Sequence, residues 1–343
     1  MEIKELLTKM NDAPHVSGYE GELAAVLSDI FSKYANVSVD KFGNFIAHKK
    51  GAGPKIMFCA HMDEIGLMVT AICDGGFVKF TQVGGIDPRN ILAQEVMIHG
   101  RKKVYGVIGI KPPHLTEPKE RKKVMKLDDM AIDTGFSKEK LETMIKIGDI
   151  ITLKQNIAQL QNNQLTGKAL DNTVSIAAMY CALKNIEHFN HSADLYFVAT
   201  AQEEVGGRGA ATATYSIKPD IGIAVDVTFG QANGLGEHES SEMGKGPVIG
   251  IGVNMNRKLF ESIKKTAVKY NTKYQVEVLP GMSGTDAQDI QIGEGGVITG
   301  LVSIPLKYMH STVETVSVSD IENCGKLLSD FIINQDWEGL LCC

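Results

Sequence analysis

The sequence has few aromatic residues and no excess of positive charge. Aromatic side chains make up 6% of the 343 residues, and the single Trp is Trp337. Surfaces that bind sugars or unstacked bases use rows of such rings, so the composition argues against both kinds of surface. Lys and Arg number 35 against 41 Asp and Glu, a formal net charge of −6 at pH 7. Because nucleic acids and anionic membranes attract basic surfaces, we expect neither as a partner.

Long apolar runs and CxxC cysteine pairs are also missing. No run reaches 18 consecutive apolar residues, and the opening MEIKELLTKMND lacks the apolar centre of a signal peptide. The cysteines lie far apart or at the end of the chain, without a CxxC pair: Cys59, Cys73, Cys181, Cys324, Cys342 and Cys343. We therefore expect a soluble, unexported, cytoplasmic protein with reduced thiols.

The composition that remains is that of an ordinary globular protein, with 43% hydrophobic and 22% charged residues. Helical and strand patterns alternate over residues 1–63 and again over 168–343, whereas residues 64–167 hold short β-rich runs broken by turns. These patterns predict an α/β fold whose central mixed sheet is flanked by helices. They also predict a smaller β-rich domain, 64–167, inserted into a discontinuous domain made of 1–63 and 168–343.

Three local signals lie near the start of the chain. Apolar residues at three-to-four spacing predict helices over 2–10 and 19–34. Ser17 precedes Glu20 by three residues, which is the spacing of a capping box at the second helix. The run KIMFCAHMD at 55–63 is nearly continuously apolar, as expected for a central strand covered on both faces by helices.

Residues with metal-binding chemistry follow the predicted strands. In open α/β sheets, ligands bind outside the carboxyl ends of the strands. Five separate segments place a His or a carboxylate at such a position, or at the start of the helix that follows. These residues are His61, Asp63, Asp171, Glu203, Glu204, Asp226 and His310.

The chemistry of this set is that of a two-metal site. Two His and three carboxylates can hold two ions of zinc, cobalt or manganese if one carboxylate bridges them. Two such ions can clamp a carbonyl and lower the pKa of a bridging water toward about 7. On an extended segment His61 and Asp63 point to the same side, so Asp63 can accept the second ring N–H of His61. Adjacent Glu203 and Glu204 diverge, so one can bind metal while the other acts as general base.

Each segment also has an ordinary structural explanation. The Glu-Glu pair could be a solvated helix start, Asp171 an N-cap and Asp226 a turn residue. Each explanation accounts for one segment only, whereas a metal site accounts for all five. His188, His191 and His238 lie in a polar helix end or a loop, and we interpret them as surface residues. No GxSxG elbow, Walker loop or Rossmann fingerprint is present, which leaves acyl-serine, nucleotide and NAD chemistry without residues.

The combined motifs resemble the dinuclear metallo-aminopeptidases that include the tetrahedral (TET) and glutamyl aminopeptidases. Some members of that family carry the label cellulase M or endoglucanase. The resemblance covers nearly the whole chain, from SGYE at 17–20 to the C-terminal helix. The motifs are HMDEIGLMV at 61–69, KALDNTVSI at 168–176, AQEEVGGRGA at 201–210, AVDVT at 224–228, GTDAQDIQ at 284–291 and TGLVSIPLKYMHSTVE at 299–314.

The resemblance implies residue roles. It implies two divalent cations per chain, zinc or cobalt and alternatively manganese, which share one carboxylate. The ligands would be His61, Asp171 and Asp226 for one ion, and Asp171, Glu204 and His310 for the other. Glu203 would be the general base and later proton donor, and Asp63 would orient His61. The discontinuous domain would be the catalytic domain and the inserted domain an oligomerisation module.

Two segments depart from the family pattern. Related sequences often continue Leu-Asp-Asp-Arg where this chain has Leu170-Asp171-Asn172-Thr173. The Asp-Val-Thr segment usually leads into Pro-rich residues where this chain has Phe229-Gly230-Gln231. The bridging carboxylate is kept, so these departures concern the walls of the site and leave the preferred N-terminal residue open.

We therefore expect a homo-oligomeric aminopeptidase, a dimer or a dodecamer, that removes N-terminal residues from peptides with Glu203 as general base. Three alternatives stay open. An endoglucanase would need two opposed carboxylates without metal. Another metal-dependent amidohydrolase could use the same cluster, and a non-catalytic assembly scaffold would not need Glu203.

Overall fold

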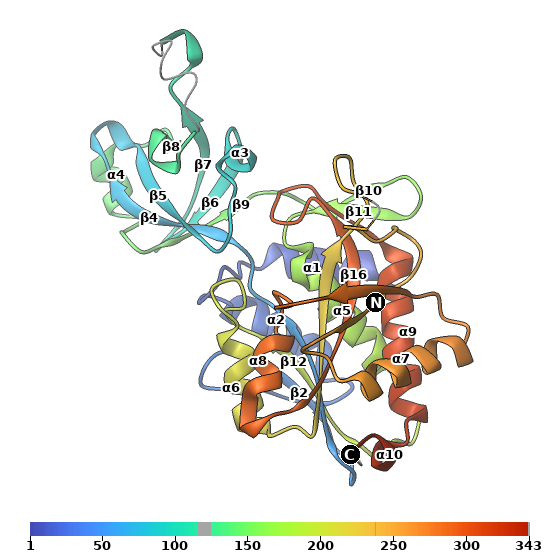
Figure 1. Ribbon diagram of the computed structural model, residues 1–343. Helices are drawn as coiled ribbons and strands as arrows, with labels where there is room; N and C mark the ends of the chain where they lie inside the picture. The colour runs from blue at the N-terminus through green and yellow to red at the C-terminus, as the bar shows by residue number, and fades with distance from the viewer. Residues whose placement is uncertain (116–124, 237, 342–343) are drawn as a thin grey trace.

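The computed structural model describes residues 1–115, 125–236 and 238–341. These residues form two separate β structures, an 11-stranded mixed sheet and a closed barrel, with helices packed around them (Figure 1). The expected α/β fold, with a mixed sheet flanked by helices and a smaller β-rich unit inserted in the chain, is confirmed.

The large sheet is built from segments of both ends of the chain. Its strands are β1 (Asn36–Val39), β2 (Phe45–Lys49), β3 (Lys55–His61), β10 (Ala158–Leu160), β11 (Gln164–Gly167), β12 (Asp194–Thr200), β13 (Ile221–Phe229), β14 (Val248–Gly252), β15 (Gln275–Leu279), β16 (Ile298–Lys307) and β17 (Glu314–Ser317). The order is β1-β2-β12-β3-β13-β16-β17-β11-β10, with β14 paired to β16 and β15 paired to β14. Strands β12, β3, β13 and β16 are parallel neighbours, so their carboxyl ends meet at one edge.

Strand β3 is buried on both faces, as its apolar sequence predicted. Ile56 and Phe58 belong to the hydrophobic cluster on one face of the sheet, while Met57 and Cys59 belong to the cluster on the other. This alternation follows from the period of two in a strand. The first cluster includes helices α1 (Ile3–Asp12), α2 (Gly21–Phe31), α5 (Leu170–Asn185), α7 (Arg257–Lys269), α9 (Val318–Asn334) and α10 (Trp337–Leu341), and the second includes α6 (Arg208–Ile217) and α8 (Ala287–Ile292).

The capping box expected before α2 is wrong. Helix α2 begins after Glu20, and its N-cap makes no side-chain capping bond. Ser17 instead donates its hydroxyl hydrogen to Oδ2 of Asp63 at 2.6 Å. Glu20 accepts hydrogen bonds from the backbone N–H groups of Gly18 and Gln202. Both side chains thus form hydrogen bonds with loop residues near the site described below.

The barrel has its own hydrophobic core. Its strands, in spatial order β4-β5-β8-β7-β6-β9, are antiparallel to their neighbours. Leu67, Ile98 and Ile132 are fully buried among them. The elements are β4 (Gly66–Ile72), β5 (Val78–Val83), α3 (Pro88–Ile91), β6 (Glu95–His99), β7 (Lys103–Ile110), β8 (Met130–Asp133), α4 (Lys138–Glu142) and β9 (Ile150–Leu153). Short 3-10 helices in this part of the chain are η1 (Asp74–Gly76), η2 (Pro113–Leu115) and η4 (Leu127–Asp129). Another, η5 (Gly293–Gly295), lies outside the barrel and follows α8.

The division into domains remains a proposal. Residues 158–167 fall inside the predicted insert 64–167, but they form β10 and β11, of which β11 pairs with β17 of the large sheet and β10 pairs with β11. We therefore propose that the inserted unit ends between residues 153 and 158.

None of the helices in the described ranges is long and apolar enough to cross a membrane. Cys59, Cys73, Cys181 and Cys324 are free thiols, and Cys342 and Cys343 lie outside the described residues.

Candidate metal centre

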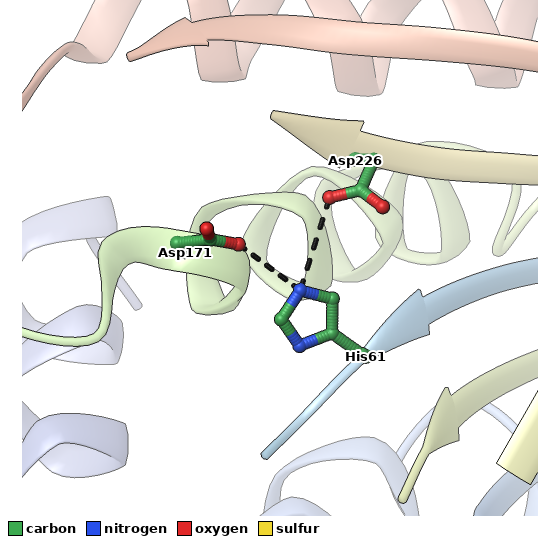
Figure 2. Close-up of side chains that lie close together, drawn as sticks. All are labelled: His61, Asp171 and Asp226. Atoms are coloured by element: carbon green, nitrogen blue, oxygen red, sulfur yellow. Dashed lines mark hydrogen bonds and ion pairs between the residues drawn. The ribbon is translucent and has the colours of Figure 1, made fainter. Parts of the chain in front are cut away.

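Three predicted ligands meet where parallel strands end. His61 is the last residue of β3, and the pairing of β13 with β3, if continued by two residues, places Asp226 level with it. Asp171 is the second residue of α5, where the backbone is not yet helical. Nε2 of His61 lies 3.0 Å from Oδ1 of Asp171 and 3.9 Å from Oδ1 of Asp226 (Figure 2). All three side chains are buried.

Asp226 lies within its strand, whereas the sequence predicted it to follow one. Strand β13 continues to Phe229 because it pairs with β16 along its whole length. The side chain still points into the site (Figure 2).

A second group shares Asp171. Nε2 of His310 lies 3.1 Å from Oε1 of Glu204 and 3.5 Å from Oδ2 of Asp171. Oδ1 of Asp171 faces His61, so the two oxygens of one carboxylate face different histidines. Within each group the candidate ligand atoms lie within 4.8 Å of one another. The structure thus brings the five residues predicted as ligands into two groups joined by Asp171.

Asp63 holds the loop that carries the glutamate pair. Its carboxylate accepts hydrogen bonds from the backbone N–H of Glu203 at 2.9 Å and of Glu204 at 3.1 Å, as well as from Ser17. Nδ1 of His61 is 3.0 Å from the backbone carbonyl oxygen of Asp63 and 3.6 Å from its carboxylate. The ring therefore lies nearer to the carbonyl than to the side chain that the spacing suggested.

Glu314 was not singled out from the sequence. Its buried carboxylate accepts hydrogen bonds from the backbone N–H of Asp171 at 3.0 Å and of His310 at 2.9 Å. It thus holds the backbone of residues from both groups. The available signal was its place at the end of the motif TGLVSIPLKYMHSTVE, four residues after His310.

Glu203 lines the same cavity as both groups but belongs to neither. Burial raises the pKa of its carboxyl to about 9, with His61 opposing this rise and Asp226 adding to it. A carboxyl whose pKa is shifted this far by burial and like charge, inside a cleft, is typical of a catalytic group.

The ionisable side chains of the two groups also have shifted pKa values. Burial raises the pKa of Asp226 well above its usual value and also raises that of Glu204. Hydrogen bonds to Asp171 and Glu204 raise the pKa of His310 to about 11. For Asp171, burial is outweighed by hydrogen bonds from His310 and His61, which hold its pKa below the usual range. Among the described residues, His61 and His310 are the positive groups that pair with these carboxylates.

The donor set fits divalent cations. Imidazole nitrogen with carboxylate oxygen suits zinc, cobalt and manganese. Asp226 is buried, and its hydrogen bond is donated by the adjacent backbone N–H of Val227. Such a carboxylate is costly to ionise unless a positive charge lies beside it, and each group is compact enough to hold one ion.

A cavity of about 410 Å³ opens onto both groups. Its walls continue along β13, β15 and β16 beyond the ionisable cluster. Space of this size is typical of a small-molecule or peptide-end binding site.

A family model and a similar protein indicate the family of this chain. The family model described as M42 glutamyl aminopeptidase matches residues 43–327. The lysyl aminopeptidase of Pyrococcus furiosus is 41% identical over 330 residues, which cover 94% of this chain and 94% of that protein.

Two solved aminopeptidase structures are similar over nearly the whole chain. The TET aminopeptidase of the marine sediment archaeon Thaumarchaeota archaeon SCGC AB-539-E09 has a TM-score of 0.93 and 32% identity, with 98% of this chain and 97% of that chain covered. The Pyrococcus horikoshii TET1 peptidase, described as able to assemble into a tetrahedron or a large octahedral shell, has a TM-score of 0.86 and 32% identity, with 96% and 99% covered.

Proposed function

The chain belongs to the M42 glutamyl aminopeptidase family, and we propose that it is a metal-dependent aminopeptidase that hydrolyses the N-terminal peptide bond of peptides. The observation that carries this proposal is the pair of compact groups joined by Asp171, with Glu203 on the wall of the same cavity. M42 peptidases depend on metal, and these residues have the chemistry to hold it.

The two groups define the proposed ligand sets. His61, Asp171 and Asp226 would hold one divalent cation, and Asp171, Glu204 and His310 would hold the other. Zinc or cobalt suits this donor set best, with manganese as the alternative. Bound cations of this kind supply Lewis-acid polarisation of the scissile carbonyl and make water more acidic.

Glu203 carries the proton transfers in this proposal. It takes a proton from the attacking water and later delivers that proton to the leaving amine. Its pKa, raised to about 9 by burial and like charge, falls once the charge of Asp226 and Glu204 is neutralised. The reaction needs a general base whose pKa lies near neutral pH.

Asp63 and Glu314 act as positioning residues in this proposal. Asp63 fixes the backbone on which Glu203 and Glu204 sit, and Glu314 fixes that of Asp171 and His310. Burial is outweighed at Asp63 by hydrogen bonds from His61 and Ser17, which hold the pKa of this carboxyl below its usual range, so it accepts its bonds as an anion and they are stronger than bonds between neutral groups. They hold the ligands near the geometry that a cation requires before it binds.

Assembly into homo-oligomers, dimers or dodecamers, is part of the proposal, and so are a cytoplasmic location and contacts made through the barrel. Support for assembly comes from the similarity to the TET1 peptidase described above. Light scattering of the purified protein would measure its size, and a monomer at all concentrations would contradict this part.

One experiment tests the activity against its rivals. Protein treated with a chelator, and the same protein reloaded with zinc, cobalt or manganese, is assayed on leucyl, lysyl and glutamyl anilides and on carboxymethyl cellulose. We expect chelation to abolish anilide hydrolysis, metal to restore it, and cellulose to remain intact. Cellulose cleavage that resists the chelator would instead favour the endoglucanase alternative, since two carboxylates suffice for a glycosidase.

A further inference from the structure

Besides Glu203, one further carboxylate on the cavity wall lies outside both cation-holding groups, namely Glu277 of β15. It reaches the cavity because neighbouring strands present a common face to it. Asp226 of β13 pairs with Ser303 of β16, which pairs with Val248 of β14, so these side chains share one face of the sheet. Two residues further along β14, Gly250 pairs with Glu277 and keeps it on that face.

Thr228 holds the Glu277 carboxylate in place. The Thr228 hydroxyl oxygen lies 3.0 Å from each of the two carboxylate oxygens, and its single hydrogen is donated to this carboxylate. Thr228 follows Asp226 by two residues on β13, so their side chains share a face and their Cα atoms are about 6.6 Å apart. The Glu277 carboxylate is therefore held at a defined position relative to the cation-holding groups.

Glu277 has no positive partner among residues 1–115, 125–236 and 238–341. Burial raises the pKa of its carboxyl, and the hydrogen bond from Thr228 opposes this rise. The hydrogen bond from Thr228 replaces only part of the hydration that a half-buried carboxylate without a counter-charge has lost. A cation brought by a ligand would restore that balance.

The cavity that Glu277 shares with the cation-holding groups has apolar as well as polar walls. Leu279 and Leu301 supply apolar surface beside polar residues such as Thr228. Gly250 leaves room there, because a Cβ at its position would lie 3.2 Å from the side chains of both leucines. The cavity thus offers apolar contact along its wall and a carboxylate farther on, which matches a methylene chain that ends in a positive group.

From these observations we infer that Glu277 selects peptides whose N-terminal residue is Lys or Arg. The inference rests on the proposed aminopeptidase function and adds its substrate class. Family membership does not decide this point, since the family description and the relative at 41% identity name opposite charges, glutamyl and lysyl. An acidic N-terminal residue would place like charge beside Glu277, and an apolar one would leave the carboxylate unpaired.

The test compares wild type with Glu277→Gln and a control, on lysyl, arginyl, leucyl and glutamyl anilides. The amide in Glu277→Gln keeps the size of the side chain and an oxygen for Thr228 but removes the charge. The control Glu322→Gln removes one charge from an exposed position on α9. The measurement is kcat/KM for each substrate, and the decisive quantity is the ratio of the lysyl to the leucyl value.

We expect wild type to cleave lysyl and arginyl substrates at least about 10-fold better than leucyl and glutamyl ones. Glu277→Gln should lower the lysyl-to-leucyl ratio by about 10–100-fold, the range of a lost hydrogen bond to a charged group, while Glu322→Gln should keep the wild-type ratio. A wild type that prefers leucyl or glutamyl substrates, or an unchanged ratio in Glu277→Gln, would overturn this inference and leave the aminopeptidase proposal standing. Inactivity of the metal-loaded wild type on every anilide would overturn both.

Discussion

Glu203 and Glu204 are adjacent in the chain, but only Glu204 belongs to a group that could hold a cation. The variants Glu203→Gln and Glu204→Gln should therefore fail differently. Glu203→Gln should keep its metal content and lose about 10²–10⁴-fold in kcat, because general-base catalysis is worth that much. Glu204→Gln should lose metal, since it removes a ligand charge. Elemental analysis and kcat measured on the same samples separate the two, and wild-type turnover in Glu203→Gln would remove it from the mechanism.

Asp63 gives a second residue-scale prediction. Asp63→Asn keeps the shape of the side chain but exchanges one acceptor oxygen for an N–H donor that faces backbone N–H groups. We expect a loss of about 10–100-fold in metal affinity or activity, as for other residues that orient ligands. Ser17→Ala, which removes only the Ser17 bond, is the matched control and should cost less. Equal activity of wild type and Asp63→Asn would show that this carboxylate does not position the glutamate pair.

Residue types at strand ends were enough to predict the set of candidate ligands, because parallel strands bring their carboxyl ends together whatever the loops do. The hydrogen bonds that support these ligands could not be predicted from the sequence. Ser17 has a capping-box partner in the sequence at Glu20, yet it donates to Asp63, 46 residues away. Glu314 acts through backbone N–H groups, and no sequence pattern reports which distant backbone a buried carboxylate will meet.

At the scale of elements, the separate core of the barrel predicts partly independent unfolding. Ile98 of β6 is fully buried in the barrel core, so Ile98→Ala should destabilise the barrel by about 2–5 kcal/mol. Trp337, the only Trp, is buried in the cluster of the large sheet and packs edge-on against Phe331. Its fluorescence therefore reports on the large sheet, whereas circular dichroism reports on both units.

We expect urea denaturation of Ile98→Ala to show a circular dichroism change that precedes the change in Trp337 fluorescence. Val107→Ala on β7 changes an exposed side chain of the same barrel and should shift either midpoint by less than about 0.5 kcal/mol. Coincident transitions in Ile98→Ala would mean that barrel and sheet unfold as one cooperative unit.

The sequence predicted which segments form strands more readily than which strands pair with one another. Strand β3 was predictable because a continuous apolar run needs cover on both faces. Strands β10 and β11 were assigned to the insert because they follow its other short strands, yet β11 pairs with β17, about 150 residues further along the chain, and β10 joins the same sheet through β11. Side-chain patterns within a strand say which face is buried but not which distant strand supplies the hydrogen bonds.

The whole molecule must fold around a cluster of buried carboxyls, and this makes its stability depend on pH and on metal. Without bound cations, burial raises the pKa of Glu203 to about 9 and that of Asp286 to about 6, and hydrogen bonds raise that of His310 to about 11. In the unfolded chain carboxyls titrate near pH 4 and histidine near pH 6.5. Between these values and the raised ones, these three groups bind more protons in the folded protein than in the unfolded chain. Their contribution to the free energy of unfolding therefore falls as pH rises through this window.

Asp171 contributes with the opposite sign, because its pKa is lowered, but its effect is confined to pH values below about 4. Cation binding requires deprotonated ligands and neutralises the carboxylates whose ionisation destabilises the fold, so metal should stabilise most at high pH. We expect the Tm of chelator-treated protein to fall between pH 5 and pH 8.5, and saturating zinc to raise Tm more at pH 8 than at pH 5. Thermal denaturation monitored by circular dichroism at each pH, with and without zinc, measures both effects. A chelated protein that became more stable toward pH 8.5, or a larger zinc stabilisation at pH 5, would contradict the proposal that a cation bound to these carboxyls stabilises the fold.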